Sequence, residues 1–253
     1  MADGDYERGR GREIGAIAAE LKRLAAARHE PQIFVLNGWA ASPHAWDLCQ
    51  FRRTRLFNYV EQLDGEPEKA LVNTERCILV GWSMGGSSAM RLAARFPEKI
   101  AGLVLIAATP RMMEDKETGW RGMTPHRLEA LRYGLLKTQG IGFFGVPEGK
   151  PNPYLADDPA NLERGLKYLL ETDVRKELTT SHQQLTTPIH IFQSEHDGIV
   201  RAENAAWLKT VFPQASVTMV PGTEHALPIF IPEKIDEAVD TCIRLAAAGQ
   251  DPA

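Results

Sequence analysis

The chain has 253 residues, of which 43% are apolar and 25% are charged. This composition excludes a wholly disordered chain, because there is enough apolar surface to offset the loss of chain entropy on folding. Lys and Arg number 29 against 33 Asp and Glu, which gives a net charge of −4 and argues against a general nucleic-acid binder. The length suits one α/β domain.

Three features predict a protein of the reducing cytoplasm without a membrane segment. The first twelve residues are charged and lack the apolar core of a secretory signal. The longest apolar run, residues 100–108, is too short to span a bilayer. Three cysteines cannot form a disulfide framework and are interpreted as buried apolar residues: Cys49, Cys77 and Cys242.

Apolar runs alternate with helical patterns along most of the chain. The expected strands cover residues 32–36, 56–60, 77–80, 102–107, 189–192 and 217–220. They lack polar alternation, which is typical of strands covered on both faces. The expected helices cover residues 13–28, 84–95, 202–211 and 232–247. This order predicts an α/β fold with a mostly parallel central sheet flanked by helices.

Residues 110–187 break the alternation, because they contain no convincing strand. Two helix starts are visible there, at Thr124-Pro125 and Asp158-Pro159, where a capping side chain precedes proline at the first helical position. We therefore expect residues 1–109 and 188–253 to form the core and residues 110–187 to be an inserted helical lid.

The sequence GWSMGG at residues 81–86 fits the pattern G-x-S-x-G between an apolar strand and an alanine-rich helix. In that context the serine, Ser83, stands exposed on a sharp turn, where only glycines allow the backbone to pass closely. A nucleophilic serine is thereby predicted at the carboxyl end of a strand.

A nucleophilic serine needs a base and an acid that orients the base. Asp197 and His225 each follow a later strand, and the order serine, acid, histidine is the one expected for this turn. Glu195 remains an alternative acid and His196 an alternative base, although His196 precedes the acid in the chain.

Acyl chemistry also needs hydrogen-bond donors for a developing oxyanion. The expected donors are the backbone amides of Met84, which follows the serine, and Trp39, which lies in the loop after the first strong strand. The indoles of Trp39 and Trp82 are expected to form an apolar wall, and we predict substrate contacts for Trp39, Trp82, Met84 and Phe143. No metal-ligand spacing and no phosphate-binding glycine loop is present in the sequence, so neither a metal nor a cofactor is expected.

Four pieces of sequence together resemble the α/β-hydrolase superfamily: Asn37-Gly38-Trp39, residues 81–86, residues 197–200 and His225-Ala226. Within it, the chain is similar to the esterases of biotin synthesis that cleave pimeloyl-acyl-carrier-protein methyl ester. The resemblance implies a serine hydrolase with Ser83 as nucleophile, His225 as base and Asp197 as orienting acid. It also implies a carrier-bound methyl ester as substrate, with methanol as one product.

The expected lid carries five basic and two acidic residues between Lys116 and Lys137. Carrier proteins are acidic, and a basic rim steers an acidic partner. We expect the carrier contacts at Arg127, Arg132, Arg164 and Lys167, whereas the alternative is a solvated helix face. The competing functions are a broad-specificity carboxylesterase, another hydrolase with the same triad, and a non-catalytic binding protein.

Overall fold

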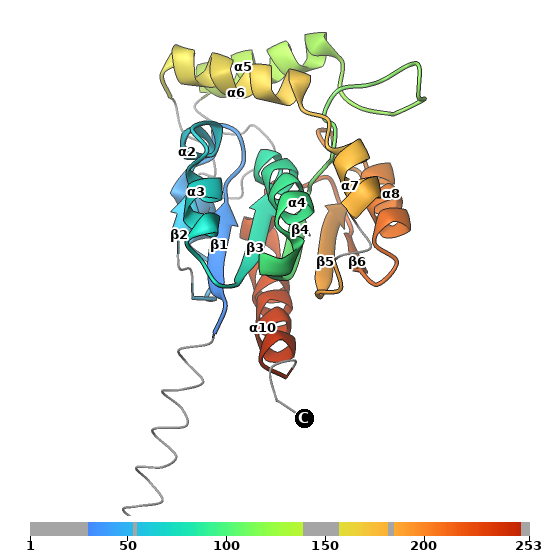
Figure 1. Ribbon diagram of the computed structural model, residues 1–253. Coiled ribbons are helices and arrows are strands. Elements are labelled where there is room, and N and C mark those ends of the chain that lie inside the picture. Colours follow the sequence, from blue (N-terminus) through green and yellow to red (C-terminus); the bar gives the residue numbers. More distant parts are fainter. Residues whose placement is uncertain (1–29, 53–54, 139–156, 182–184, 249–253) are drawn as a thin grey trace, which may run out of the picture.

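The computed structural model describes residues 30–52, 55–138, 157–181 and 185–248. In this part of the chain, six parallel strands form one sheet in the order β2-β1-β3-β4-β5-β6 (Figure 1). The strands are β1 (Gln32–Leu36), β2 (Arg55–Phe57), β3 (Cys77–Trp82), β4 (Ile100–Ile106), β5 (Ile189–Ser194) and β6 (Ser216–Val220). The predicted α/β architecture with a mostly parallel sheet is confirmed.

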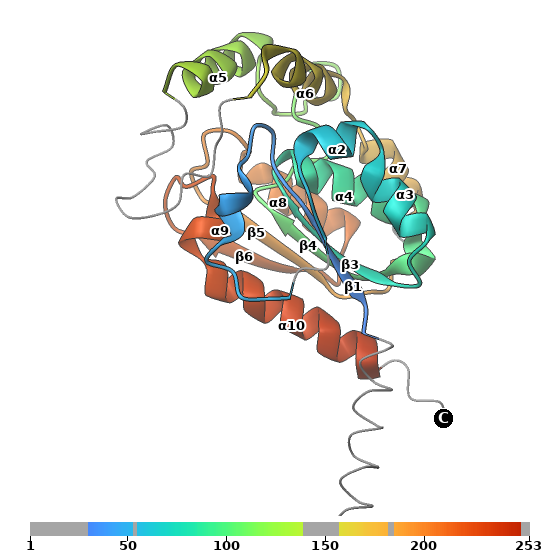
Figure 2. The ribbon, with the colours of Figure 1, turned by 90° about the vertical axis from the view of Figure 1, so that its left-hand side faces the viewer.

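Helices cover both faces of the sheet. One face carries α3 (Glu66–Val72), α4 (Met84–Arg95), α7 (Arg175–Ser181) and α8 (Glu203–Val211), and the other carries α10 (Pro232–Ala248) (Figures 1 and 2). Shorter helices are α2 (Tyr59–Leu63), α9 (Leu227–Phe230) and the 3₁₀ turns η1 (Pro43–Trp46) and η2 (Pro97–Lys99). The predicted helices over 84–95, 202–211 and 232–247 therefore exist, whereas the one over 13–28 lies outside the described residues.

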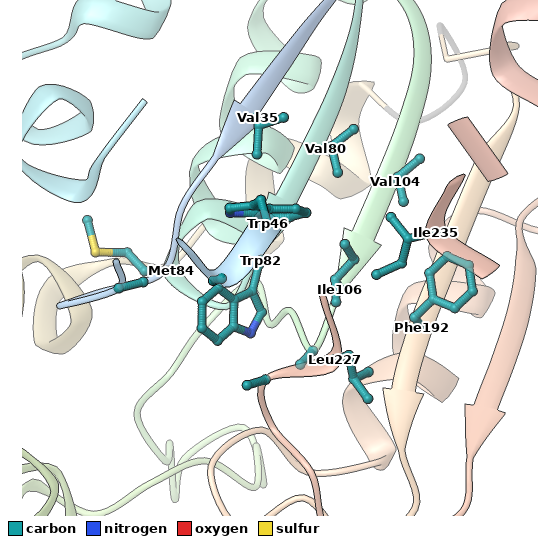
Figure 3. Packing of buried hydrophobic residues seen from close by; sticks show 14 of the residues in the cluster. Val35, Trp46, Val80, Trp82, Met84, Val104, Ile106, Phe192, Leu227 and Ile235 are labelled. Atoms are coloured by element: carbon teal, nitrogen blue, oxygen red, sulfur yellow. The ribbon is translucent and has the colours of Figure 1, made fainter. Parts of the chain in front are cut away.

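The period of two along each strand explains why both faces are apolar. In β1, Ile33 and Val35 join the core cluster on the α10 side, while Phe34 and Leu36 join the cluster beneath α4. Figure 3 shows the first cluster, with Val35, Val80 and Val104 on neighbouring strands. A strand that is buried on both faces has no polar side, as the uninterrupted apolar runs indicate.

One expected strand is wrong in part. The run over 56–60 is predicted to be a strand, but β2 ends at Phe57 and Asn58 is the N-cap of α2. The Asn58 side chain accepts a hydrogen bond from the Glu61 amide at 2.9 Å, and the Glu61 carboxylate accepts one from the Asn58 amide at 2.9 Å. This reciprocal cap stabilises a helix start and overrides the strand preference of Tyr59 and Val60.

The segment over 110–187 contains α5 (Pro125–Thr138), α6 (Pro159–Glu171) and α7. Both helix starts expected there are present: Thr124 Oγ1 accepts from the Arg127 amide at 3.3 Å, and Asp158 Oδ1 accepts from the Ala160 amide at 2.8 Å. Helices α5 and α6 lie across the carboxyl ends of the strands (Figures 1 and 2). Helix α7 instead packs on α4, with Leu178 in the cluster beneath α4, so only part of the segment lies over the strand ends.

Candidate active site

Ser83 lies on the turn between β3 and α4, in a strained backbone conformation with φ 55° and ψ −119°. The surroundings leave no room for side chains on the flanking glycines. A Cβ on Gly85 would lie 2.0 Å from the Leu36 carbonyl oxygen, and one on Gly81 would lie 2.5 Å from the Gly85 oxygen. The glycines thus let β1, β3 and α4 approach closely enough to hold Ser83 in its strained turn.

We expect Gly85→Ala to destabilise the protein by roughly 1–3 kcal/mol or more, because the new methyl group meets backbone rather than a flexible side chain. The thermal unfolding midpoint should fall by about 2–4 °C for each kcal/mol in a chain of this size. Gly198→Ala is the matched control, since a Cβ there meets no heavy atom of the described residues within 4 Å. Equal midpoints for the two variants would contradict the steric account.

A chain of hydrogen bonds connects the three residues predicted as a triad. His225 Nε2 lies 3.0 Å from Ser83 Oγ, and His225 Nδ1 lies 2.8 Å from Asp197 Oδ2. All three residues are buried, with 8%, 3% and 6% exposure for Ser83, His225 and Asp197. Asp197 follows β5 and His225 follows β6, so parallel strands bring together residues that are 142 positions apart.

The alternative acid and the alternative base, Glu195 and His196, do not take part in this chain of hydrogen bonds. Glu195 and His196 are exposed, whereas Asp197 points inward from the same loop. Asp197 Oδ1 accepts hydrogen bonds from the amides of Ile199 at 2.7 Å and Val200 at 3.2 Å. These bonds fix the carboxylate and leave Oδ2 directed at His225, so the geometry brings Asp197 to the histidine.

The loop after β1 places a second backbone segment against Ser83. A Cβ on Gly38 would lie 3.4 Å from the Ser83 Cβ, so Gly38 and Trp39 run beside the serine. Met84 occupies the first position of α4, where an amide has no acceptor within its own helix. The two amides expected to bind an oxyanion therefore belong to segments that flank Ser83.

Asn37 builds this loop, a role that the sequence did not indicate. Its Oδ1 accepts from the Gly38 amide at 3.1 Å and from the Trp46 indole at 3.0 Å, and its Nδ2 donates to the Ala41 carbonyl at 3.0 Å. Asn37 is fully buried. These bonds satisfy its polar atoms and hold the turn that carries Trp39.

The two tryptophans expected as an apolar wall also position other segments. The Trp82 indole donates to the His225 carbonyl at 2.9 Å, and the Trp39 indole donates to the Leu162 carbonyl of α6 at 3.3 Å. Figure 3 shows Trp82 within the apolar cluster. Trp82 therefore holds the loop of the candidate base, and Trp39 ties the loop after β1 to α6.

An apolar cavity adjoins Ser83 and contains about 20 Å³ of free space between the described residues. Its walls come from the end of β3, from loops that follow the strands and from α5 and α6: Gly38, Trp39, Trp82, Ser83, Met112, Leu128, Leu131, Leu169, Ile199 and His225. This space suits about one water molecule and is far below the roughly 300 Å³ of a ligand pocket. A larger cavity of about 440 Å³, beside Trp120 and Trp207, shares no lining residue with it.

The basic residues expected at a carrier interface already have partners. Arg132 pairs with Glu129 and Glu163 at 3.3 Å, Arg164 pairs with Asp64, and Lys167 pairs with Glu171 at 4.0 Å. The Arg127 guanidinium donates to the Gly198 carbonyl at 3.1 Å. An acidic partner would have to compete with these contacts. Of the expected substrate contacts, Met84 is fully buried and does not line the cavity beside Ser83, and Phe143 lies outside the described residues.

The described residues contain no group of three or more His, Cys, Asp or Glu side chains placed to hold a metal ion. They also contain no helix that is both long and apolar enough to cross a membrane.

A family model described as the alpha/beta hydrolase fold matches residues 37–156. Solved structures agree over more of the chain. A hydrolase from Oleispira antarctica matches with a TM-score of 0.64, 17% identity and coverage of 85% of this chain and 91% of that chain. An esterase from Exiguobacterium antarcticum matches with a TM-score of 0.63, 16% identity and coverage of 85% and 93%. The chain has the α/β-hydrolase fold.

Several curated relatives of the chain are named pimeloyl-[acyl-carrier protein] methyl ester esterase. The protein from Nitrosospira multiformis is 29% identical over 175 residues, which span 62% of this chain and 65% of that relative. The one from Nitrosomonas europaea is 26% identical over 248 residues, covering 83% of this chain and 94% of the relative. At 16–17% identity the solved structures show the fold alone.

Proposed function

We propose that this protein is a serine esterase in which Ser83 is the nucleophile. The observation that carries the proposal is the buried chain of hydrogen bonds from Ser83 through His225 to Asp197. His225 Nε2 takes the Ser83 proton as Oγ attacks the ester carbonyl, and Asp197 orients the imidazole and stabilises its charged form. The amides of Trp39 and Met84 stabilise the oxyanion.

The leaving alcohol receives the same proton from His225, which leaves an acyl group on Ser83. Water then attacks the acyl-enzyme, with His225 again as base, and releases the carboxylate. No step needs a metal or a cofactor.

We propose that the substrate is the methyl ester of a pimeloyl group carried by acyl carrier protein, with methanol and a free ω-carboxylate as products. The names of the relatives from Nitrosospira multiformis and Nitrosomonas europaea support this substrate. The apolar lining of the cavity supports it as well, because Met112, Leu128 and Leu169 suit a polymethylene chain. Arg127, Arg132, Arg164 and Lys167 are the proposed contacts for the carrier.

We also propose that α5 and α6 act as a lid that moves away before the acyl chain enters, because the free space beside Ser83 holds no more than about one water molecule. Contacts with Tyr59 of α2 and with Trp39 hold α6 and the residues just before it in place. Tyr59 donates to Asp157, and burial together with this bond raises the pKa of Tyr59 well above its ordinary range, so the phenol remains a donor. A Cβ on Gly165 would lie 2.4 Å from the Trp39 ring, so only glycine lets α6 seat against that indole.

The test compares two esters. We expect methanol release from the methyl ester of pimeloyl-acyl carrier protein to show a kcat/KM at least about tenfold above that for p-nitrophenyl acetate, because remote binding energy favours the true substrate. Efficient hydrolysis of p-nitrophenyl acetate with no release from the carrier-bound ester would favour a broad carboxylesterase. Hydrolysis of neither ester would contradict the esterase proposal.

A further inference from the structure

The last two residues of β5 are buried, and each donates hydrogen bonds toward a loop of the triad. Gln193 is 1% exposed and Ser194 is 0% exposed. Gln193 Nε2 lies 2.8 Å from the Val200 carbonyl, 3.2 Å from the Ser194 carbonyl and 3.4 Å from Asp197 Oδ2. The Ser194 hydroxyl donates to the carbonyl of Glu224, which directly precedes His225.

The loop over 194–200 needs such support because it turns around the buried Asp197 carboxylate and comes back to the end of β5 at Val200. Within the loop, the Ile199 and Val200 amides hold Asp197 Oδ1. The Gln193 amide joins the carbonyls at the two ends of the loop, and it reaches Oδ2, the oxygen that faces His225. An amide nitrogen carries only donors, so it fits among these acceptors, and Asp197 Oδ2 has lone pairs for both Gln193 Nε2 and His225 Nδ1.

We infer that Gln193 is a positioning residue for catalysis: it closes the loop over 194–200 so that Asp197 Oδ2 stays within hydrogen-bond distance of His225 Nδ1. Gln193 is absent from the described lining of the Ser83 cavity, so it acts through Asp197 rather than on the substrate. The inference rests on the proposed function, since it assigns a task within the same triad.

The first variant is Gln193→Met, which keeps the length and burial of the side chain and removes its donors. We expect kcat for p-nitrophenyl acetate to fall roughly 10- to 100-fold, since small misplacements of catalytic groups have effects of this size, with KM changed by less than about twofold. The matched control is Gln214→Met, which removes a comparable bond, from Nε2 to the Leu185 carbonyl at 2.8 Å, in the loop between α8 and β6. Its kcat should stay within about twofold of the parent.

To distinguish a positioning role that acts through Asp197 from a merely structural role, Gln193→Met is repeated in an Asp197→Ala background. If Gln193 acts through Asp197, the second substitution changes kcat by less than about twofold, because residues of one unit are strongly non-additive. Effects that multiply, or an unchanged kcat for Gln193→Met alone, would overturn the inference. If Gln193→Met does not fold, Gln193→Asn replaces it, because the shorter amide cannot reach Val200 and the same fall is expected.

The Ser83→Ala variant distinguishes a failure of the proposed function from a failure of the positioning role. If Ser83→Ala hydrolyses the ester as fast as the parent, the proposed function fails. If Ser83→Ala is inactive while Gln193→Met matches the parent, only the positioning role fails.

Discussion

Replacing Ser83 with alanine is expected to lower kcat for ester hydrolysis by about 10⁵- to 10⁶-fold, the scale found when a triad nucleophile is removed. The variant loses the atom that forms the acyl-enzyme, and His225 Nε2 loses the hydroxyl that lies 3.0 Å away. Residual activity would come from binding and from the oxyanion-binding amides acting on water. Steady-state hydrolysis of p-nitrophenyl acetate measures the effect.

The matched control for this variant is Ser88→Ala. Ser88 lies on α4 just beyond the turn, and its hydroxyl contacts the Tyr168 hydroxyl at 3.2 Å rather than the triad. We expect its kcat to stay within about twofold of the parent. If Ser83→Ala retained more than a few per cent of the parent rate, Ser83 would not be the nucleophile.

Asp197→Asn is expected to lower kcat by about 10⁴-fold while leaving the fold intact, as the equivalent change does in a serine protease triad. Asp197 Oδ2 accepts a hydrogen bond from His225 Nδ1 at 2.8 Å, which leaves Nε2 free to take the Ser83 proton. An asparagine amide presents a donor at that place or weakens the acceptor, so the imidazole is held in the wrong tautomer. The measurement is kcat at neutral pH, with far-ultraviolet circular dichroism to verify folding.

Glu195→Gln is the control that separates the two carboxylates of this loop. Glu195 is exposed and is not bonded to His225 in the described residues, so its neutralisation should change kcat by less than about twofold. A large fall for Glu195→Gln with a small one for Asp197→Asn would assign the acid to Glu195 and contradict the geometry.

The triad residues were predictable from the sequence because each of them comes shortly after a predicted strand. Ser83, Asp197 and His225 each follow an apolar run, and parallel strands bring their carboxyl ends to one edge of the sheet. The starts of α5 and α6 were predictable from Thr124-Pro125 and Asp158-Pro159 for a different reason. A helix cap is a local interaction, so both of its partners lie within a few residues of each other in the sequence.

Contacts between distant parts of the chain were not predictable. The Trp82 indole meets the His225 carbonyl across 143 positions, and Arg164 pairs with Asp64 across 100 positions. Neither partner is marked by a local pattern, since tertiary packing decides which carboxylate or carbonyl lies within reach. The expected strand over 56–60 is cut short for a local reason instead, because Asn58 and Glu61 form a helix cap directly after Phe57.

The most direct test of the central claim is covalent labelling with a fluorophosphonate, which reacts with an activated serine and mimics the tetrahedral intermediate. Intact-mass analysis and peptide mapping should find one adduct, on Ser83, and none on the Ser83→Ala variant. Asp197→Asn should label far more slowly than the parent, while Glu195→Gln should label at the parent rate. An adduct that persists on Ser83→Ala, or the absence of any adduct on the folded parent protein, would contradict the assignment of Ser83 as the catalytic nucleophile.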